Sequence, residues 1–464
     1  MRKKLYFTFF SLLSLTYSCQ KDKTSNQETN QIIQEFTQDN YHTFAKSLAK
    51  IIDNKEIKAA LKAKALEKFD GDYDVLVKDF VLVKLKDGNS VLDLLTEQNE
   101  EIRSIIANNP LLTIYVPELT IFSANNWDTE KTTPIIAIRN NKGGNKIYAY
   151  NTRLNIIELD KKIEPTIPTI LVKSNERLPF IDNESVQIVN SKPFSKIASD
   201  RTGSDRSKDM GFAPRIEEAI SKGLPLSNIR DYVYYGLDPK NNILKGELNS
   251  QNYAEHIRAI ELTSKAVLDK IADWGEGDLE IKITVNIPQR DGTPLQISKA
   301  IFCKKTDLYQ EPTSRKEGFV RLFVGFDPIQ IATWDNYNLG NLWTFHAEEF
   351  DEGEERTSTE TIENTFTKEG GGSFEVTLKE IFKIGLSGKV SEVERKTTTF
   401  TMKSTNNSDN LYGAILNYLE PIAIADGTGN YNPYYLNTGA IKIRVEPYPT
   451  GGIPPTNTGG TRPR

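Results

Sequence analysis

The spacing of the apolar residues changes near residue 111 of this 464-residue chain, and this change limits how the chain can fold. Before residue 111 apolar residues recur at helical intervals, as in Phe44, Leu48 and Ile51. After it, most apolar residues fall in short or alternating runs that Gly, Pro and Asn separate, which is typical of strands and turns. We therefore expect an α+β fold with an N-terminal helical segment, a middle α/β portion and a C-terminal antiparallel β-sandwich-like domain.

The expected segments follow this pattern along the chain. In chain order they are a signal peptide (1–18), a flexible tether (19–29), a mainly helical segment (30–110), a β-rich segment (111–190), a polar linker or loop (191–216), a helical segment (217–277), a β-sandwich-like domain (278–448) and a disordered tail (449–464).

Local signals place several helix ends. Asn54 can cap the helix that follows it, and Ser90 with Asp93 resembles a capping box. A further helix is predicted over 251–273, with an inward stripe of Ile257, Ile260, Val267 and Ile271.

Composition excludes several classes of protein. With 38% apolar and 26% charged residues the chain can bury a core, so it is not a disordered chain. Its 3 His and 2 Cys exclude a disulfide scaffold and a Cys/His zinc cluster. A net charge of −5 argues against nucleic acid as a partner.

The N-terminal residues predict export from the cytoplasm. The basic residues 2–4 precede 13 uncharged, mostly apolar residues, Leu5 to Tyr17. A helix of that length is too short to span a bilayer core of about 30 Å, but it suits a signal peptide. No later run approaches 18 apolar residues.

Ser18 and Cys19 follow this run directly, and here the sequence resembles a bacterial lipoprotein signal. The resemblance implies that Cys19 is diacylated and becomes the first residue of the mature chain. Thr16 replaces the usual Leu, which the looser signals of Bacteroidota tolerate. Residues 20–23 resemble the signal that sends some of those lipoproteins to the cell surface.

The body of the chain also resembles large Bacteroidota lipoproteins of no known activity. We therefore expect a protein anchored in the outer membrane by lipid and displayed on the cell surface. The alternative is an ordinary secretory signal, cleaved after Thr16-x-Ser18, that releases a secreted protein.

Two acidic stretches are candidate metal sites. Asp70, Asp72 and Asp74 place carboxylates at alternate positions, as a calcium ion requires, although Val75 and Val81 break the EF-hand pattern. The alternative is an acidic turn that ends a helix. No other cofactor is predicted.

The second stretch begins at His346 and is the densest acidic run of the chain. Within it His346, Glu348 and Asp351 are candidate ligands, with calcium the expected ion because most donors are carboxylate oxygens. The alternative for this run is a solvated loop between two strands.

Residues 355–405 are rich in Thr, Ser and charge, so both faces of their predicted strands are polar. This composition resembles the amphipathic hairpin of aerolysin-type pore-forming toxins, which would imply insertion into a membrane. Charged residues such as Glu394, Arg395 and Lys396 leave no clean apolar band. The alternative is an extended hairpin on the surface.

The leading functional hypothesis is a surface-displayed binding or structural lipoprotein whose ligand is an unidentified protein or glycan. The first alternative is a hydrolase of polysaccharide or protein that uses carboxylates or calcium, and pore formation is the third. The sequence contains no HExxH, Walker A or GxSxG motif, and no catalytic residue is predicted. A pocket with two converging carboxylates would favour the hydrolase, and a detached hairpin would favour the pore.

Overall fold

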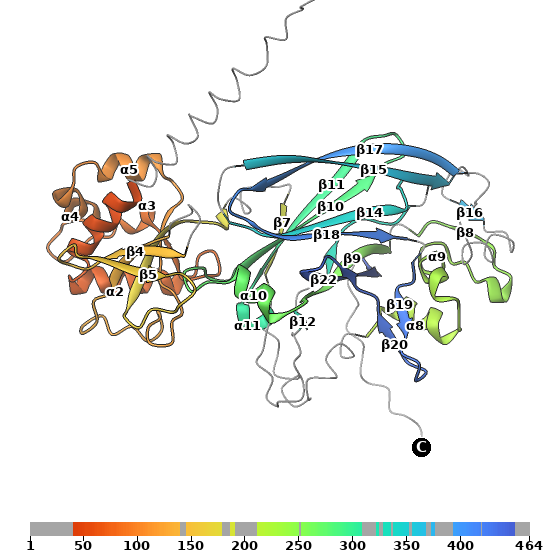
Figure 1. The fold of residues 1–464 in the computed structure, drawn as a ribbon, viewed down its shortest axis with the longest axis horizontal. Helices are drawn as coiled ribbons and strands as arrows, with labels where there is room; N and C mark the ends of the chain where they lie inside the picture. The colour runs from red at the N-terminus through yellow and green to blue at the C-terminus, as the bar shows by residue number, and fades with distance from the viewer. Residues whose placement is uncertain are drawn as a thin grey trace, which may run out of the picture.

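The computed structural model describes most of the chain after residue 39 (Figure 1). The described ranges are 40–139, 145–178, 186–190, 211–249, 252–308, 322–323, 328–335, 337–351, 355–367, 373–375, 393–418 and 420–450. The predicted signal peptide, the tether with Cys19, residues 191–210 of the predicted linker and residues 451–464 of the predicted tail lie outside these ranges.

An N-terminal α/β unit occupies residues 40–178, at the left of Figure 1. Its six-stranded sheet has the order β1 (Asp74–Leu76), β2 (Leu112–Tyr115), β6 (Thr169–Ser174), β3 (Ile135–Ile138), β4 (Lys146–Tyr150) and β5 (Ile156–Asp160). All neighbours pair antiparallel except β3 and β6. Its helices are residues 40–51, α2 (Lys55–Glu67), α3 (Val77–Phe80), α4 (Val91–Gln98) and α5 (Ile102–Asn108).

The predicted helix starts are confirmed. Oδ1 of Asn54 accepts hydrogen bonds from the backbone N–H groups of Glu56 and Ile57, and Ser90 with Asp93 forms a complete capping box. Both arrangements satisfy N–H groups that have no partner inside the helix.

Two sheets form the C-terminal β-rich part, which confirms the predicted α+β class. The first has the order β18 (Asp409–Asn417), β14 (Leu342–Glu349), β10 (Leu279–Pro288), β11 (Pro294–Cys303) and β7 (Val186–Asn190). The second has the order β12 (Leu322–Phe323), β9 (Tyr253–Leu262), β22 (Ile441–Pro449) and β21 (Leu436–Asn437), with β13 (Ile329–Gln330) also on β9. Buried side chains of β9, β10, β14 and β22 share one core, as in a sandwich.

Smaller elements surround these sheets. They are the helices α8 (Pro214–Ser221), α9 (Ile229–Tyr235), α10 (Lys265–Ile271) and α11 (Lys305–Leu308), the short helices η2 (Leu226–Asn228) and η3 (Pro239–Asn241), and the strand pairs β8 (Lys245–Glu247) with β16 (Ser373–Glu375) and β19 (Ala423–Ala425) with β20 (Tyr431–Pro433).

The helix predicted over 251–273 is wrong for its first half, which is strand β9, and only α10 is helical. Ile257 pairs with Val445, whereas Ala259 pairs with Arg444, so Arg258 is the extra residue of a β-bulge. A bulge shifts the alternation by one residue, so Ile257 and Ile260 both reach the core at a spacing of three. That spacing is the one on which the helix prediction rested.

The Thr-rich region forms a long hairpin of β15 (Glu355–Thr367) and β17 (Val393–Thr405), whose 13 residue pairs run from Glu355–Thr405 to Thr367–Val393. The hairpin runs along the face of β10, β11 and β14 in Figure 1. Ile362 and Phe400 are buried, whereas Thr361 and Thr399 face outward. This arrangement agrees with the extended surface hairpin, which is docked rather than detached.

Candidate functional site

The first predicted metal group, Asp70, Asp72 and Asp74, lies between α2 and β1. Helix α2 ends at Glu67, and Lys68 adopts the left-handed conformation that closes it. The three carboxylates are buried, and Asp70 accepts a hydrogen bond from the Asn175 amide at 2.7 Å. The acidic turn is therefore present, but it is not solvated.

Basic side chains from the N-terminal unit compensate these carboxylates. The Arg177 guanidinium lies 3.7 Å from Asp72 and 2.7 Å from Glu280 of β10, and Lys173 lies 3.6 Å from Asp74. Arg177 thereby joins the N-terminal unit to the first C-terminal sheet.

Asp351 from the second predicted metal group reaches the same region. Its carboxylate lies 2.6 Å from Arg139, which also pairs with Glu176 at 2.8 Å and Glu276 at 2.7 Å. Burial and these three carboxylates act in opposite directions on the Arg139 guanidinium, and its pKa is raised well above its ordinary value.

We call this region the charged seam. Its carboxylates are Asp70, Asp72, Asp74, Glu176, Glu276, Asp278, Glu280, Glu349 and Asp351, and its cations are Arg139, Lys173 and Arg177. The fold thus brings Asp351 of the second predicted metal group into the same region as the first group, where three basic side chains offset part of the negative charge.

Glu349 is one of several seam residues that sequence analysis did not name. The solvated loop predicted for this run is wrong for residues 346–349, which belong to β14. Glu349 is 1% exposed, and neither of its carboxylate oxygens has a hydrogen-bond partner among the described residues. Burial, and then the charges of Asp351 and Glu276, raises its pKa well above the ordinary value.

His346 and Glu348 do not share a partner. Glu348 pairs with Lys282 at 2.7 Å, whereas Nε2 of His346 lies 2.9 Å from Glu360 of the hairpin. Within the described ranges, no three His, Cys, Asp or Glu side chains are placed to hold a metal ion. Calcium binding at either of the two predicted groups stays a prediction.

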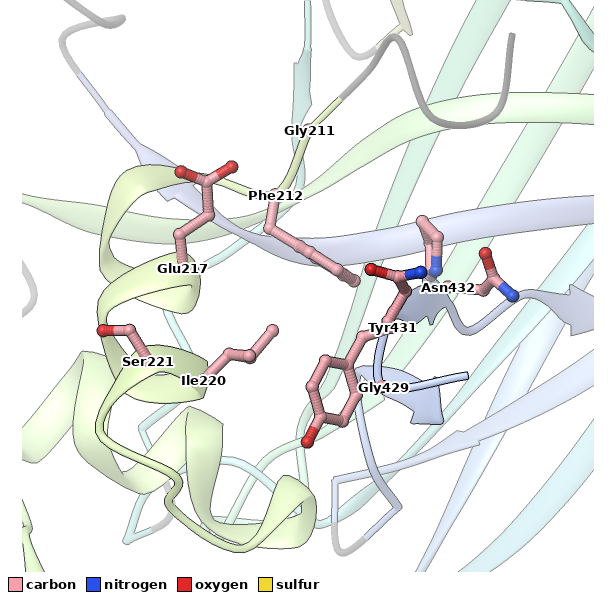
Figure 2. Close-up of a pocket in the computed structure, with 10 residues that line it drawn as sticks. Gly211, Phe212, Glu217, Ile220, Ser221, Gly429, Tyr431 and Asn432 are labelled. Carbon is pink, nitrogen blue, oxygen red and sulfur yellow. The ribbon is translucent and has the colours of Figure 1, made fainter. Parts of the chain in front are cut away.

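A pocket of about 440 Å³ lies elsewhere, between α8 and the β19–β20 hairpin (Figure 2). Figure 2 shows Phe212 and Ile220 on one side and Tyr431 on the other, with Glu217 and Ser221 on α8 and Asn432 on the hairpin. The volume falls in the range of roughly 300–1,000 Å³ that ligand pockets span.

Helix α8 is fixed by its inner face. Pro214 stands at its first position, where a proline is well tolerated. Ile216 and Ala219 are buried in a small core with α9 and with Ile422, the residue before β19. The same core therefore holds both walls of the pocket.

The turn between β19 and β20 is also well defined. Oδ1 of Asp426 accepts hydrogen bonds from the backbone N–H groups of Thr428 at 2.8 Å and Asn430 at 3.1 Å. Gly427 and Gly429 have φ values of +78° and +94°, which glycine adopts without strain. This turn fixes the position of Tyr431.

Three polar side chains of the pocket have no partner among the described residues. The Glu217 carboxylate, the Tyr431 hydroxyl and the Asn432 amide make no hydrogen bond or ion pair within the described part of the chain. A Cβ at Gly211 would lie 3.0 Å from Oε1 of Glu217, so the glycine leaves space for that carboxylate.

A buried cation, Arg444, lies behind the Phe212 ring. Arg444 lies 5.4 Å from the centre of the Phe212 ring and pairs with Glu446 at 2.7 Å. It also donates a hydrogen bond to the carbonyl of Gly211 at 3.3 Å. Glu446 also pairs with Arg258 at 3.4 Å, so two guanidinium groups share one carboxylate behind the apolar wall.

Comparisons with known proteins give no functional lead. The chain matches no known protein family, and no curated protein or solved structure resembles it significantly. Among the described helices, none combines the length and the apolar character needed to span a bilayer.

Proposed function

We propose that this chain is an outer-membrane lipoprotein, anchored through Cys19 and displayed on the cell surface, that binds a ligand in the pocket between α8 and β19–β20. The observation that carries the binding role is the pocket itself. Two segments some 200 residues apart in the chain form it and leave polar side chains unpaired in its wall.

Binding fits this pocket better than hydrolysis. A glycosidase of the usual kind needs two carboxyl groups on either side of the bond that it cleaves. Glu217 is the one carboxylate among the described residues that line the pocket. The seam contains many carboxylates, but they are largely buried and basic side chains pair with several of them.

The pore-forming alternative gains no support from the hairpin. Its inward face carries Glu360, which accepts hydrogen bonds from Asn286 at 3.0 Å and Thr344 at 2.7 Å. Lys396 on the same face donates a hydrogen bond to the carbonyl of Arg290. A lipid-facing strand requires an apolar band, which charged residues on this face interrupt.

The anchor can be tested with the two cysteines of the chain. In cells that make the Cys19→Ala variant we expect loss of radioactive palmitate from the protein and its release from the membrane fraction. Cys303→Ala is the matched control, because Cys303 is buried at the end of β11. It should keep both the label and the membrane association.

A Cys19→Ala protein that stays labelled and membrane-bound would contradict the anchor. Equal loss of the label and of membrane association in both variants would indicate misfolding. A circular dichroism spectrum of the released protein would detect that misfolding.

A further inference from the structure

The lining of the pocket combines apolar surfaces with a few unpaired polar groups. The rings of Phe212 and Tyr431 and the side chains of Ile220 and Pro433 supply the apolar surfaces. An aromatic ring has a negative face, which attracts the weakly positive C–H groups of a sugar ring.

The polar groups match the hydroxyl groups of such a ring. An ionised carboxylate such as Glu217 only accepts hydrogen bonds, and its two oxygens suit two neighbouring hydroxyl donors. The Tyr431 hydroxyl both donates and accepts. Neither group has a partner among the described residues, so each is available to a ligand.

Charge narrows the class of sugar. The pocket wall contains the Glu217 carboxylate and, among its described residues, no Lys or Arg. Arg444 behind Phe212 is paired with Glu446. A ligand with its own carboxylates, such as a uronic acid oligomer, would meet the like charge of Glu217 and no basic side chain among the described residues of the pocket wall.

We infer that the pocket binds a neutral oligosaccharide, with the C–H face of one sugar ring against Tyr431 or Phe212 and hydroxyl groups on Glu217. This inference rests on the proposed binding role of the same pocket. The pocket volume limits the bound part to a few rings.

The test is calorimetric titration of the purified full-length protein in detergent. The probes are maltohexaose, cellohexaose, mannohexaose and xylohexaose, with hexagalacturonate as the anionic counterpart and a peptide rich in Phe and Leu as the apolar counterpart. We expect at least one neutral hexasaccharide to bind and hexagalacturonate to bind at least about ten-fold more weakly.

Two pocket variants and two matched controls locate the binding. Tyr431→Ala and Glu217→Gln should each weaken the sugar about ten-fold or more. Tyr412→Ala removes a tyrosine that is 58% exposed on β18, and Glu363→Gln removes an exposed carboxylate of the hairpin. Both controls should bind like the unmodified protein.

The outcomes separate the sugar inference from the proposed function. If no neutral hexasaccharide binds, or if hexagalacturonate binds as tightly, the sugar inference is overturned. If only the apolar peptide binds and Tyr431→Ala weakens it, the binding role of the pocket stands and the sugar class is wrong. If a sugar binds equally to all variants, both proposals for this pocket fail.

Discussion

Asp231 lies on α9, a helix whose seven residues are all buried, and burial raises the pKa of its carboxyl to about 7. The Asn228 amide, 3.3 Å away, and the neighbouring Arg230 offset this effect only in part. The folded protein therefore holds a proton at Asp231 that the unfolded chain releases at lower pH. The protonated Asp231 carboxyl contributes its full share of the folding free energy below pH 4. This contribution is lost as the pH rises through 7.

Asp231→Asn should remove this pH dependence, because an amide carries no titratable proton. We expect the variant to be more stable than the unmodified protein at pH 8 by about 1 kcal/mol or more. Urea unfolding between pH 4 and pH 8 measures the difference. The control Asp269→Asn, on the exposed face of α10, should follow the unmodified protein. Parallel pH curves for both variants would contradict the assignment.

At the scale of elements, the β15–β17 hairpin is attached by a small apolar face and by polar contacts. Phe400 and Ile362 supply the buried apolar surface, and the Lys282 ammonium donates a hydrogen bond to the carbonyl of Lys403. Because the outward face is polar, these inward contacts decide whether the hairpin stays on the sheet.

Phe400→Ala should loosen the hairpin. Large-to-small substitutions of a buried Phe cost about 3–5 kcal/mol, and here the loss falls on one two-stranded element. Hydrogen exchange of the β15 and β17 amides should become much faster, while β10 changes little. Thr399→Ala, on the outward face, is the control. Unchanged exchange of these amides in Phe400→Ala would show that the polar contacts hold the hairpin without the Phe400 side chain.

How far the elements could be predicted depends on how local their causes are. The caps at Asn54 and Ser90 involve residues within three positions of one another, so the sequence shows them directly. The bulge at Arg258 depends on pairing with β22, nearly 190 residues later, so the sequence around it resembles a helix.

The candidate site was less accessible to prediction for the same reason. Phe212 lies within the predicted polar linker, and Tyr431 lies in a Gly- and Asn-rich stretch that reads as a turn. Their proximity follows from the shared core of α8, α9 and Ile422, which no local pattern reveals. Likewise, nothing near Asp70 or Asp351 shows that Arg139 and Arg177 lie against them.

At the scale of the whole molecule, the charged seam joins the N-terminal unit to the first C-terminal sheet. Arg139 comes from the N-terminal unit and holds Glu276 and Asp351 from the C-terminal part. Removing one partner of a buried ion pair leaves the other charge without compensation, which costs about 3–5 kcal/mol.

Arg139→Met should therefore destabilise the protein by about that amount at pH 7. The control is Lys304→Met, which breaks an exposed pair with Glu118 across the same two parts and should cost less than about 1 kcal/mol. Denaturant unfolding measures both. Equal and small effects would show that the seam contributes little to holding the two parts together.

The mass of the mature N-terminus tests the central claim, that the chain is a lipid-anchored surface protein, most directly. Mass spectrometry of the protein isolated from its native membrane should find Cys19 as the first residue, carrying the mass of a diacylglyceryl group. A mature N-terminus at any other residue, or a Cys19 without acyl mass, would contradict this account.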